Sequence, residues 1–147
     1  MKISTKGKYG LKAIVDIAVN SQNGKSVSIK SISNRQGISE NYLEQIISNL
    51  KKAGILNSIR GANGGYYLTN PPNLTTVGDV LRVLEGPLLP SYCVLNPSED
   101  SCGDSDCSTC STREVWIALF NKINEVLDSI TINDLAKDPK PLILEDF

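Results

Sequence analysis

All four cysteines of this 147-residue chain lie in one stretch, residues 93–110, with the sequence CVLNPSEDSCGDSDCSTC. Cys102, Cys107 and Cys110 have the spacing C-x4-C-x2-C, which is typical of plant-type [2Fe–2S] sites, and Cys93 adds a fourth thiol upstream. Four thiolates also suit tetrahedral zinc, but zinc sites usually contain two close cysteine pairs, and only Cys107 and Cys110 form one. Thiol or disulfide sensing is the third alternative. The spacing favours an iron–sulfur cluster.

Other kinds of chemistry have little support in this sequence. It contains no histidine, no G-x-S-x-G motif and no phosphate-binding loop, so we expect that it is not an enzyme. Lys12 and Asp16 interrupt the apolar residues of the N-terminal segment, so we do not expect this segment to be a signal peptide. No apolar run approaches the length of a membrane span. We therefore expect a cytoplasmic protein with no membrane partner, whose thiols stay reduced.

Charge is distributed unevenly along the chain. Residues 1–60 carry ten Lys and Arg against three Asp and Glu, whereas residues 61–147 carry five against thirteen. A basic N-terminal half is typical of a module that binds a polyanion, although two solvated surfaces of different charge would give the same count.

Two short helices with a tight turn between them are expected in the basic half. The first follows Ser28 and ends at Gly37; the second covers residues 40–53, begins after Ser39 and ends at Gly54. This is the pattern of a helix-turn-helix, in which the second helix enters the major groove. One face of that helix is apolar, and the other is rich in amide and hydroxyl groups that suit base edges. The alternative is a helical hairpin of a small bundle.

A β-hairpin is expected directly after the second helix. Two β-rich segments surround the loop GANGG, and its Asn63-Gly64 pair is a strong hairpin signal. A hairpin in this place is the wing of a winged helix, and Arg60 at its mouth could reach phosphate or a narrow minor groove. An ordinary turn with an exposed arginine is the alternative.

The longest apolar helix is expected over residues 113–130, after the cysteine stretch. The stripe of apolar side chains along this helix is wider than one small winged-helix domain can cover, which suggests that the helix packs against its copy in a homodimer. A buried core helix within the monomer is the alternative. A short last helix could begin at Thr131, which has capping-box spacing to Asp134. The fold class is therefore mainly α with a small β-hairpin wing, a winged helix-turn-helix plus a long dimerisation helix. The expected interface residues of this helix are Trp116, Phe120, Ile123 and Leu127.

The segments MKISTKGKYGLKAIVDIA, QGISENYLEQIISNLKKAGIL, SIRGANGGYYL and VGDVLRVLEGP resemble the Rrf-two family of bacterial winged-helix transcription regulators, over about residues 1–138. The resemblance implies a homodimer that binds a double-stranded DNA operator of two-fold symmetry. The expected organisation is a DNA-binding domain (1–86), a cysteine-rich cluster-binding loop (87–112), a dimerisation helix with a short terminal helix (113–138) and a tail (139–147).

The resemblance also places DNA contacts on residues of this sequence. Glutamine can pair with adenine and glutamate can accept a hydrogen bond from cytosine, so Gln45 and Glu44 suit base readout. Lys51 stands where some members have arginine, and a contact with the DNA backbone is expected there. The implied contacts are Tyr9, Ser39, Asn41, Leu43, Glu44, Gln45, Lys51 and Arg60.

The family divides at the cysteine stretch. Cluster-binding members have three cysteines, followed three positions later by a fourth ligand. Here Cys93, Cys102 and Cys107 take the three places and Cys110 the fourth, so the resemblance implies a cluster that controls operator binding, [2Fe–2S] favoured over [4Fe–4S]. The first gap is longer than in the family pattern. The alternative is a cysteine-metabolism repressor, which this chain resembles in RVLEGP; such members act through cysteine synthase, and the cysteines here would then bind zinc or sense thiols.

Overall fold

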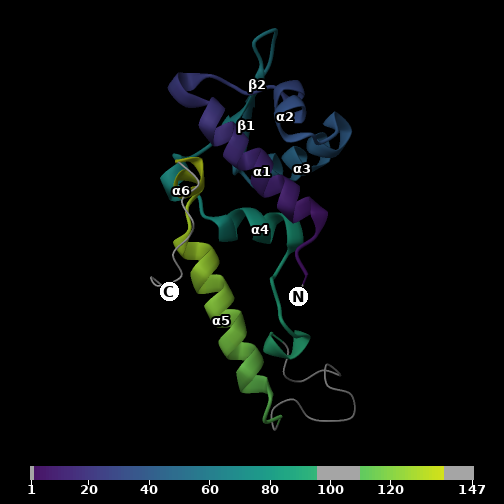
Figure 1. The fold of residues 1–147 in the computed structure, drawn as a ribbon, viewed down its shortest axis with the longest axis vertical. Helices are drawn as coiled ribbons and strands as arrows, with labels where there is room; N and C mark the ends of the chain where they lie inside the picture. Colours follow the sequence, from purple (N-terminus) through teal and green to yellow (C-terminus); the bar gives the residue numbers. More distant parts are fainter. Residues whose placement is uncertain (1, 96–109, 138–147) are drawn as a thin grey trace.

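The computed structural model of this protein describes residues 2–95 and 110–137. The helices α1 to α4 and one hairpin form a single body, and α5 extends away from it (Figure 1). The elements follow in the order α1 (Thr5–Asn20), η1 (Gln22–Gly24), α2 (Ile29–Gln36), α3 (Glu40–Lys52), β1 (Leu56–Ile59), β2 (Gly65–Leu68), η2 (Pro72–Leu74), α4 (Val77–Glu85), η3 (Tyr92–Val94), α5 (Arg113–Ser129) and α6 (Ile132–Ala136).

Local capping residues fix the ends of the two helices of the helix-turn-helix. The Ser28 hydroxyl accepts a hydrogen bond from the Ser31 N–H at the start of α2, and Gly37 ends this helix with a left-handed φ of 66°. The Ser39 hydroxyl accepts from the Tyr42 N–H and starts α3. The helix-turn-helix expected from the sequence is confirmed, with α3 ending one residue earlier than expected.

The wing is a two-stranded antiparallel hairpin that is anchored to the segment before α2. Leu56 pairs with Leu68 and Ile59 with Gly65, and Tyr66 forms a bridge with Val27 outside the hairpin. A Cβ atom on Gly65 would lie 2.5 Å from the Val27 backbone, so only glycine permits this approach. The bridge therefore fixes the wing relative to α2.

The core lies between α1 and the helices packed around it. Ile14, Ile17, Ile46, Leu50 and Val80 are all at most 1% exposed. Burying each such side chain contributes about 1.5–3 kcal/mol, which makes this body a stable platform for the surface of α3.

The chain after α5 returns to the winged-helix body. Ile132 of α6 is fully buried in the core that α1 shares, and Thr131 and Asp134 form the expected capping box. The hydrogen bonds from Thr131 lower the pKa of Asp134, so this box stabilises α6 at neutral pH and is lost as the pH falls through that lowered pKa.

The long helix α5 differs from every other long helix in its exposure. None of its residues is buried, and Val115 and Leu119 are 53% and 44% exposed. Its C-terminal end does contact the core of its own chain, through Val126 and Leu127. The apolar stripe expected from the sequence is thus divided between the core and an open face. Within the described residues, no helix is long and apolar enough to span a membrane.

Candidate nucleic-acid interface and cysteine segment

The outer face of α3 presents the polar side chains expected to contact DNA. Asn41, Glu44, Gln45 and Lys51 are exposed, and Ser39 is exposed at the cap of the helix. Leu43 differs, because its side chain is fully buried in the core. The Leu43 side chain packs the helix against the core, so the predicted contact of this residue with DNA would have to use its backbone.

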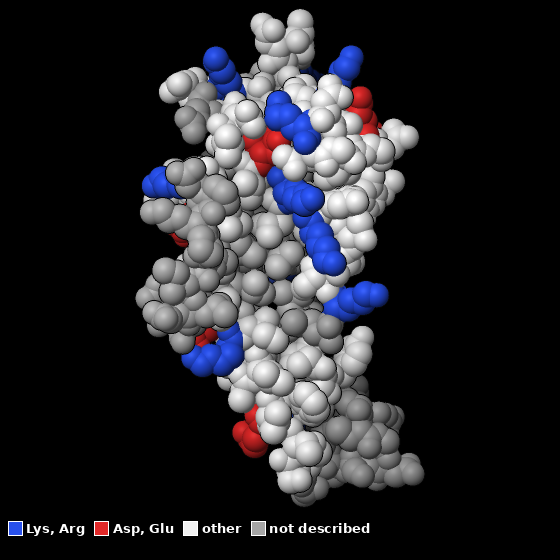
Figure 2. Space-filling view, in the orientation of Figure 1, with Lys and Arg blue, Asp and Glu red and all other residues white. Residues whose placement is uncertain are grey.

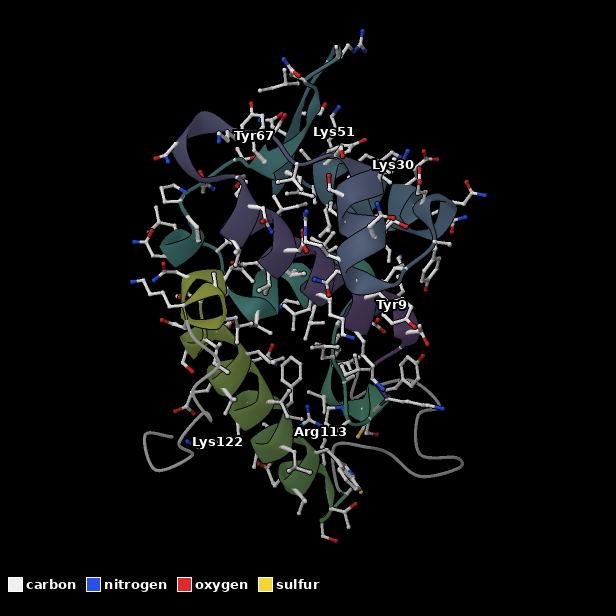
Figure 3. The ribbon with its side chains drawn as sticks, turned by 45° about the horizontal axis from the view of Figure 1, so that its top comes forward. Tyr9, Lys30, Lys51, Tyr67, Arg113 and Lys122 are labelled. Atoms are coloured by element: carbon white, nitrogen blue, oxygen red, sulfur yellow. The ribbon has the colours of Figure 1, made fainter. Side chains whose placement is uncertain are left out.

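The start of α1 lies beside the start of α3 through an aromatic contact. The rings of Tyr9 and Tyr42 meet edge to face with centroids 6.0 Å apart, and the Lys12 ammonium lies 5.9 Å from the Tyr9 ring centroid. Tyr9 is half-buried and labelled in Figure 3. The structure therefore brings Tyr9 next to the N-terminal turn of α3.

The wing is tied to the helix-turn-helix by side chains at both of its ends. The Lys51 ammonium, in the last turn of α3, donates to the Ser58 hydroxyl of β1. The Ser26 hydroxyl, just before α2, donates to the Asn63 carbonyl in the wing loop at 2.9 Å. Arg60 is exposed at the mouth of that loop. Within this loop Gly61 adopts a positive φ of 114°, whereas the φ of Asn63 is not positive.

Positive charge gathers on the winged-helix body. Lys and Arg side chains form a line across this body in Figure 2, and few acidic side chains interrupt it. Lys8 and Lys12 of α1 and Lys30 of α2 are exposed. Such a surface attracts a polyanion. When a nucleic acid binds, the positive side chains displace the counterions that are condensed on its phosphates.

An ion pair between a buried aspartate of α1 and an exposed arginine of α2 joins these two helices, and the sequence did not point to it. The Asp16 carboxylate is 2% exposed and accepts hydrogen bonds from the Arg35 guanidinium, the shortest at 2.6 Å, and from the Gln36 amide at 2.9 Å. The hydrogen bond with Asp16 raises the pKa of Arg35. The signal in the sequence was Asp16, an aspartate among the apolar residues of the first helix. Helical periodicity cannot identify the residue that pairs with it.

We expect Arg35→Ala to destabilise the fold more than Asp16→Ala does. Arg35→Ala leaves a buried carboxylate with no cation, held only by the Gln36 amide at 2.9 Å and the Asn20 amide at 3.5 Å, which costs about 1–3 kcal/mol. Asp16→Ala lets Arg35, already 40% exposed, turn to solvent. Urea denaturation of the two single variants and the double variant measures this order. A double variant no more stable than Arg35→Ala would contradict it.

Two of the four cysteines lie within the described residues. Cys93 belongs to η3 and is buried, with its Sγ 3.2 Å from the Ser91 hydroxyl. Cys110 is half-buried just before α5, with its Sγ 3.2 Å from the Thr112 hydroxyl. Cys102 and Cys107 lie outside the described residues. Residues 2–95 and 110–137 alone bring together no group of three His, Cys, Asp or Glu side chains that could hold a metal ion.

The residues expected at a dimer interface are half-buried along α5. Trp116, Phe120 and Ile123 do not belong to the core, whereas Leu127 packs against it. The large apolar residues of α5 that are exposed are Val115 and Leu119, and Trp116, Phe120 and Ile123 are half-buried on the same helix.

Comparison with known proteins agrees with this arrangement. The family model Rrf2, described as an iron-dependent transcriptional regulator, matches residues 3–138. The transcriptional regulator CymR of Bacillus subtilis is 46% identical over 136 residues, which cover 92% of this chain and 90% of that protein. The regulator IscR of Vibrio campbellii is 36% identical over 149 residues, which cover 99% and 83%.

Solved structures of the same two regulators are also similar. The structure of CymR from B. subtilis has a TM-score of 0.76 and 44% identity, and covers 92% of this chain and 96% of its own. The structure of IscR from T. potens has a TM-score of 0.73 and 44% identity, with 95% and 89% covered.

The helix-turn-helix, the wing and the basic surface define a winged-helix transcription regulator and not an enzyme. The chain belongs to the Rrf2 (Rrf-two) family of transcription regulators, and it is related both to CymR and to IscR.

Proposed function

We propose that this regulator acts as a homodimer on an operator of two-fold symmetry, and that an iron–sulfur cluster held by Cys93, Cys102, Cys107 and Cys110 controls its binding to DNA. One observation carries the DNA part of the proposal. The exposed amide and carboxylate groups of α3, the Tyr9 ring and the Arg60 guanidinium belong to neighbouring elements of one basic body.

The residues of this body divide into two kinds of contact. Gln45 and Glu44 read base edges in the major groove, with Asn41 and Ser39 at the start of the helix. Lys51 and Arg60 contact phosphate or the minor groove, and Tyr9 supports the start of α3. Lys51 also donates a hydrogen bond to Ser58 of β1. This bond holds the wing in a fixed position relative to α3.

The two cysteines that the structure describes fit a thiolate-held cluster. Both are soft donors: Cys93 lies in η3, which contacts α5, and Cys110 lies three residues before the first residue of α5. A bound cluster would supply a redox-sensitive link between four cysteine thiolates. Four thiolates serve either cluster type, and the C-x4-C-x2-C spacing favours [2Fe–2S].

Helix α4 provides the physical connection from the cysteine segment to the DNA surface. Its Arg82 bonds Asn124 and Asp128 of α5, and its Glu85 accepts hydrogen bonds from the N–H and the hydroxyl of Ser4 at the start of α1. The chain then runs from Glu85 through Gly86 towards Cys93. A change in the cysteine segment can therefore alter both the dimer helix and the position of Tyr9.

Substitutions on the two kinds of contact should have different effects on DNA binding. Gln45→Ala should relax the preference at one base position by about 1–3 kcal/mol. Arg60→Ala should weaken binding to all sequences and reduce the salt slope by about 1. The measurement is a salt titration of affinity for a selected operator and for random DNA, with Lys122→Ala on α5 as the control. Equal losses on both DNAs for Gln45→Ala would remove it from base readout.

The similarity to CymR favours a second candidate function. In it, the protein is a repressor of cysteine metabolism that responds by binding cysteine synthase, and its cysteines bind zinc or sense thiols. Protein purified without oxygen distinguishes the two candidates. A reddish-brown protein with visible absorbance supports the cluster, whereas a colourless protein that binds cysteine synthase supports the second candidate.

A further inference from the structure

One arginine of α4 holds the long helix α5 against the winged-helix body. The Arg82 guanidinium donates hydrogen bonds to the Asn124 side-chain oxygen at 3.2 Å and to the Asp128 carboxylate. Asn124 and Asp128 are four residues apart, so their side chains lie one above the other on the same face of α5. A planar guanidinium that bonds both acceptors fixes the direction of this helix as well as its position.

The body contacts α5 near the C-terminal end of this helix. Val126 and Leu127 pack against the core, and the Val77 N–H of α4 donates to the Ile130 carbonyl oxygen at 2.9 Å. The rest of α5 extends away from the body (Figure 1), and its other end contacts η3. The angle of α5 relative to the body is therefore set at one end, where Arg82 lies.

A glycine leaves the space in which the Arg82 bonds form. Gly78 of α4 is buried, and a Cβ atom on it would overlap the Asp128 carboxylate and lie 2.9 Å from the Arg82 guanidinium. Gly78 does not have a positive φ, and alanine generally forms helices better than glycine does. Neither the backbone conformation nor helix stability therefore requires glycine here, whereas the contact between α4 and α5 does.

Small changes in the angle of α5 have large consequences because the helix is long. Its 17 residues span about 25 Å at about 1.5 Å per residue. A tilt of about 8° at the Arg82 end displaces the other end by about 3.4 Å, which is the rise of one base pair of DNA. In a dimer joined through α5, such a tilt moves each copy of α3 by about one base pair relative to the two-fold axis.

We propose that Arg82 determines the spacing between the two operator half-sites that the protein accepts. By fixing the angle between α5 and the winged-helix body, it sets the distance between the two copies of α3. The proposal rests on the proposed function for the homodimer joined through α5. It adds a residue of α4 that controls the spacing of the half-sites and not the reading of bases by α3.

A series of operators with different spacings tests this inference. A half-site is first selected from random-sequence DNA with the full-length protein purified without oxygen, and two inverted copies are then placed at spacings that differ by single base pairs. For the wild type, a spacing one base pair from the optimum should bind about 5–150-fold more weakly, the discrimination of about one good base contact. Arg82→Met should lose most of this difference and keep the wild-type preference among half-site sequences.

Three further variants separate the geometry of this junction from its charge. Gly78→Ala keeps every charge and displaces the Asp128 carboxylate, so it should also weaken the spacing preference. Arg82→Lys keeps the charge but not the planar guanidinium, and should retain only part of the preference. Lys122→Met is the matched control: it breaks an exposed ion pair with Glu125 inside α5 and should keep the wild-type spacing.

Sedimentation and thermal unfolding separate this role from folding and assembly. Arg82→Met should remain a dimer and unfold within about 2–4 °C of the wild type, because an ion pair that is one-third to one-half exposed contributes little to stability. Loss of the dimer in Arg82→Met would assign this residue to assembly and overturn the inference.

The spacing series also distinguishes failure of this inference from failure of the proposed function. Equal spacing preferences of the wild type and Arg82→Met, both dimeric, would overturn the role of Arg82 and leave the proposed homodimer in place. A dimeric wild type that binds all spacings equally would have the same meaning. A monomeric wild type would overturn the proposed homodimer and this inference with it.

Discussion

Ile123→Asp is expected to convert the protein to monomers and to abolish operator binding at the same time. Ile123 is half-buried on α5 and lies outside the core of its own chain. In a two-fold interface each substitution occurs twice. Losing two buried isoleucines costs about 3–6 kcal/mol, which is about 100- to 10,000-fold in the dimer dissociation constant. The buried charges add a desolvation cost.

Asn121→Asp is the matched control, because it adds the same charge to an exposed position on the opposite face of α5. Sedimentation should show a dimer for Asn121→Asp and a folded monomer for Ile123→Asp, with the same helical circular dichroism. An intact dimer in Ile123→Asp would mean that the protein associates through another surface.

Replacing any one of the four cysteines by serine is expected to remove the cluster and its control of DNA binding. Serine has a hard oxygen in place of a soft sulfur, so three thiolates would remain for a site that uses four. The expected result is loss of the visible absorbance and of cluster-bound iron and sulfide. The remaining DNA affinity should equal that of the metal-free wild type.

Cys93 needs a separate control, because its side chain is only 1% exposed. Serine there buries a hydroxyl, whereas Cys93→Ala keeps the position apolar. Both variants should lose the cluster, and Cys93→Ala should keep the unfolding temperature of the metal-free wild type. A cluster that survives in any of the four variants would remove that cysteine from the ligand set.

The sequence was sufficient wherever a local signal decided the structure. Ser28 and Gly37 fixed the ends of α2, and the capping box of Thr131 and Asp134 started α6. The wing followed from two short β-rich segments around a glycine-rich loop. In each case a few consecutive residues determine backbone hydrogen bonds, so no knowledge of distant contacts is needed.

Contacts between distant residues were beyond this kind of prediction. The bridge from Val27 to Tyr66, the ion pair of Asp16 with Arg35 and the hydrogen bond of Arg113 with the Cys93 carbonyl each join separate elements. Periodicity shows which face of a helix is apolar but not what covers it. It therefore missed the division of the α5 stripe, of which only the C-terminal part packs against the core of the chain.

The affinity of one protein sample for its operator, with and without the cluster, tests the central proposal most directly. An operator is first selected from random-sequence DNA with protein purified without oxygen. Its affinity is then measured before and after the cluster is removed by a chelator, with Cys107→Ser as the control that has no cluster to lose. We expect a change of about 5–150-fold for the wild type, the usual range of coupling between two sites, and none for the control. Equal affinity of the cluster-bound and cluster-free wild type would contradict control of DNA binding by an iron–sulfur cluster.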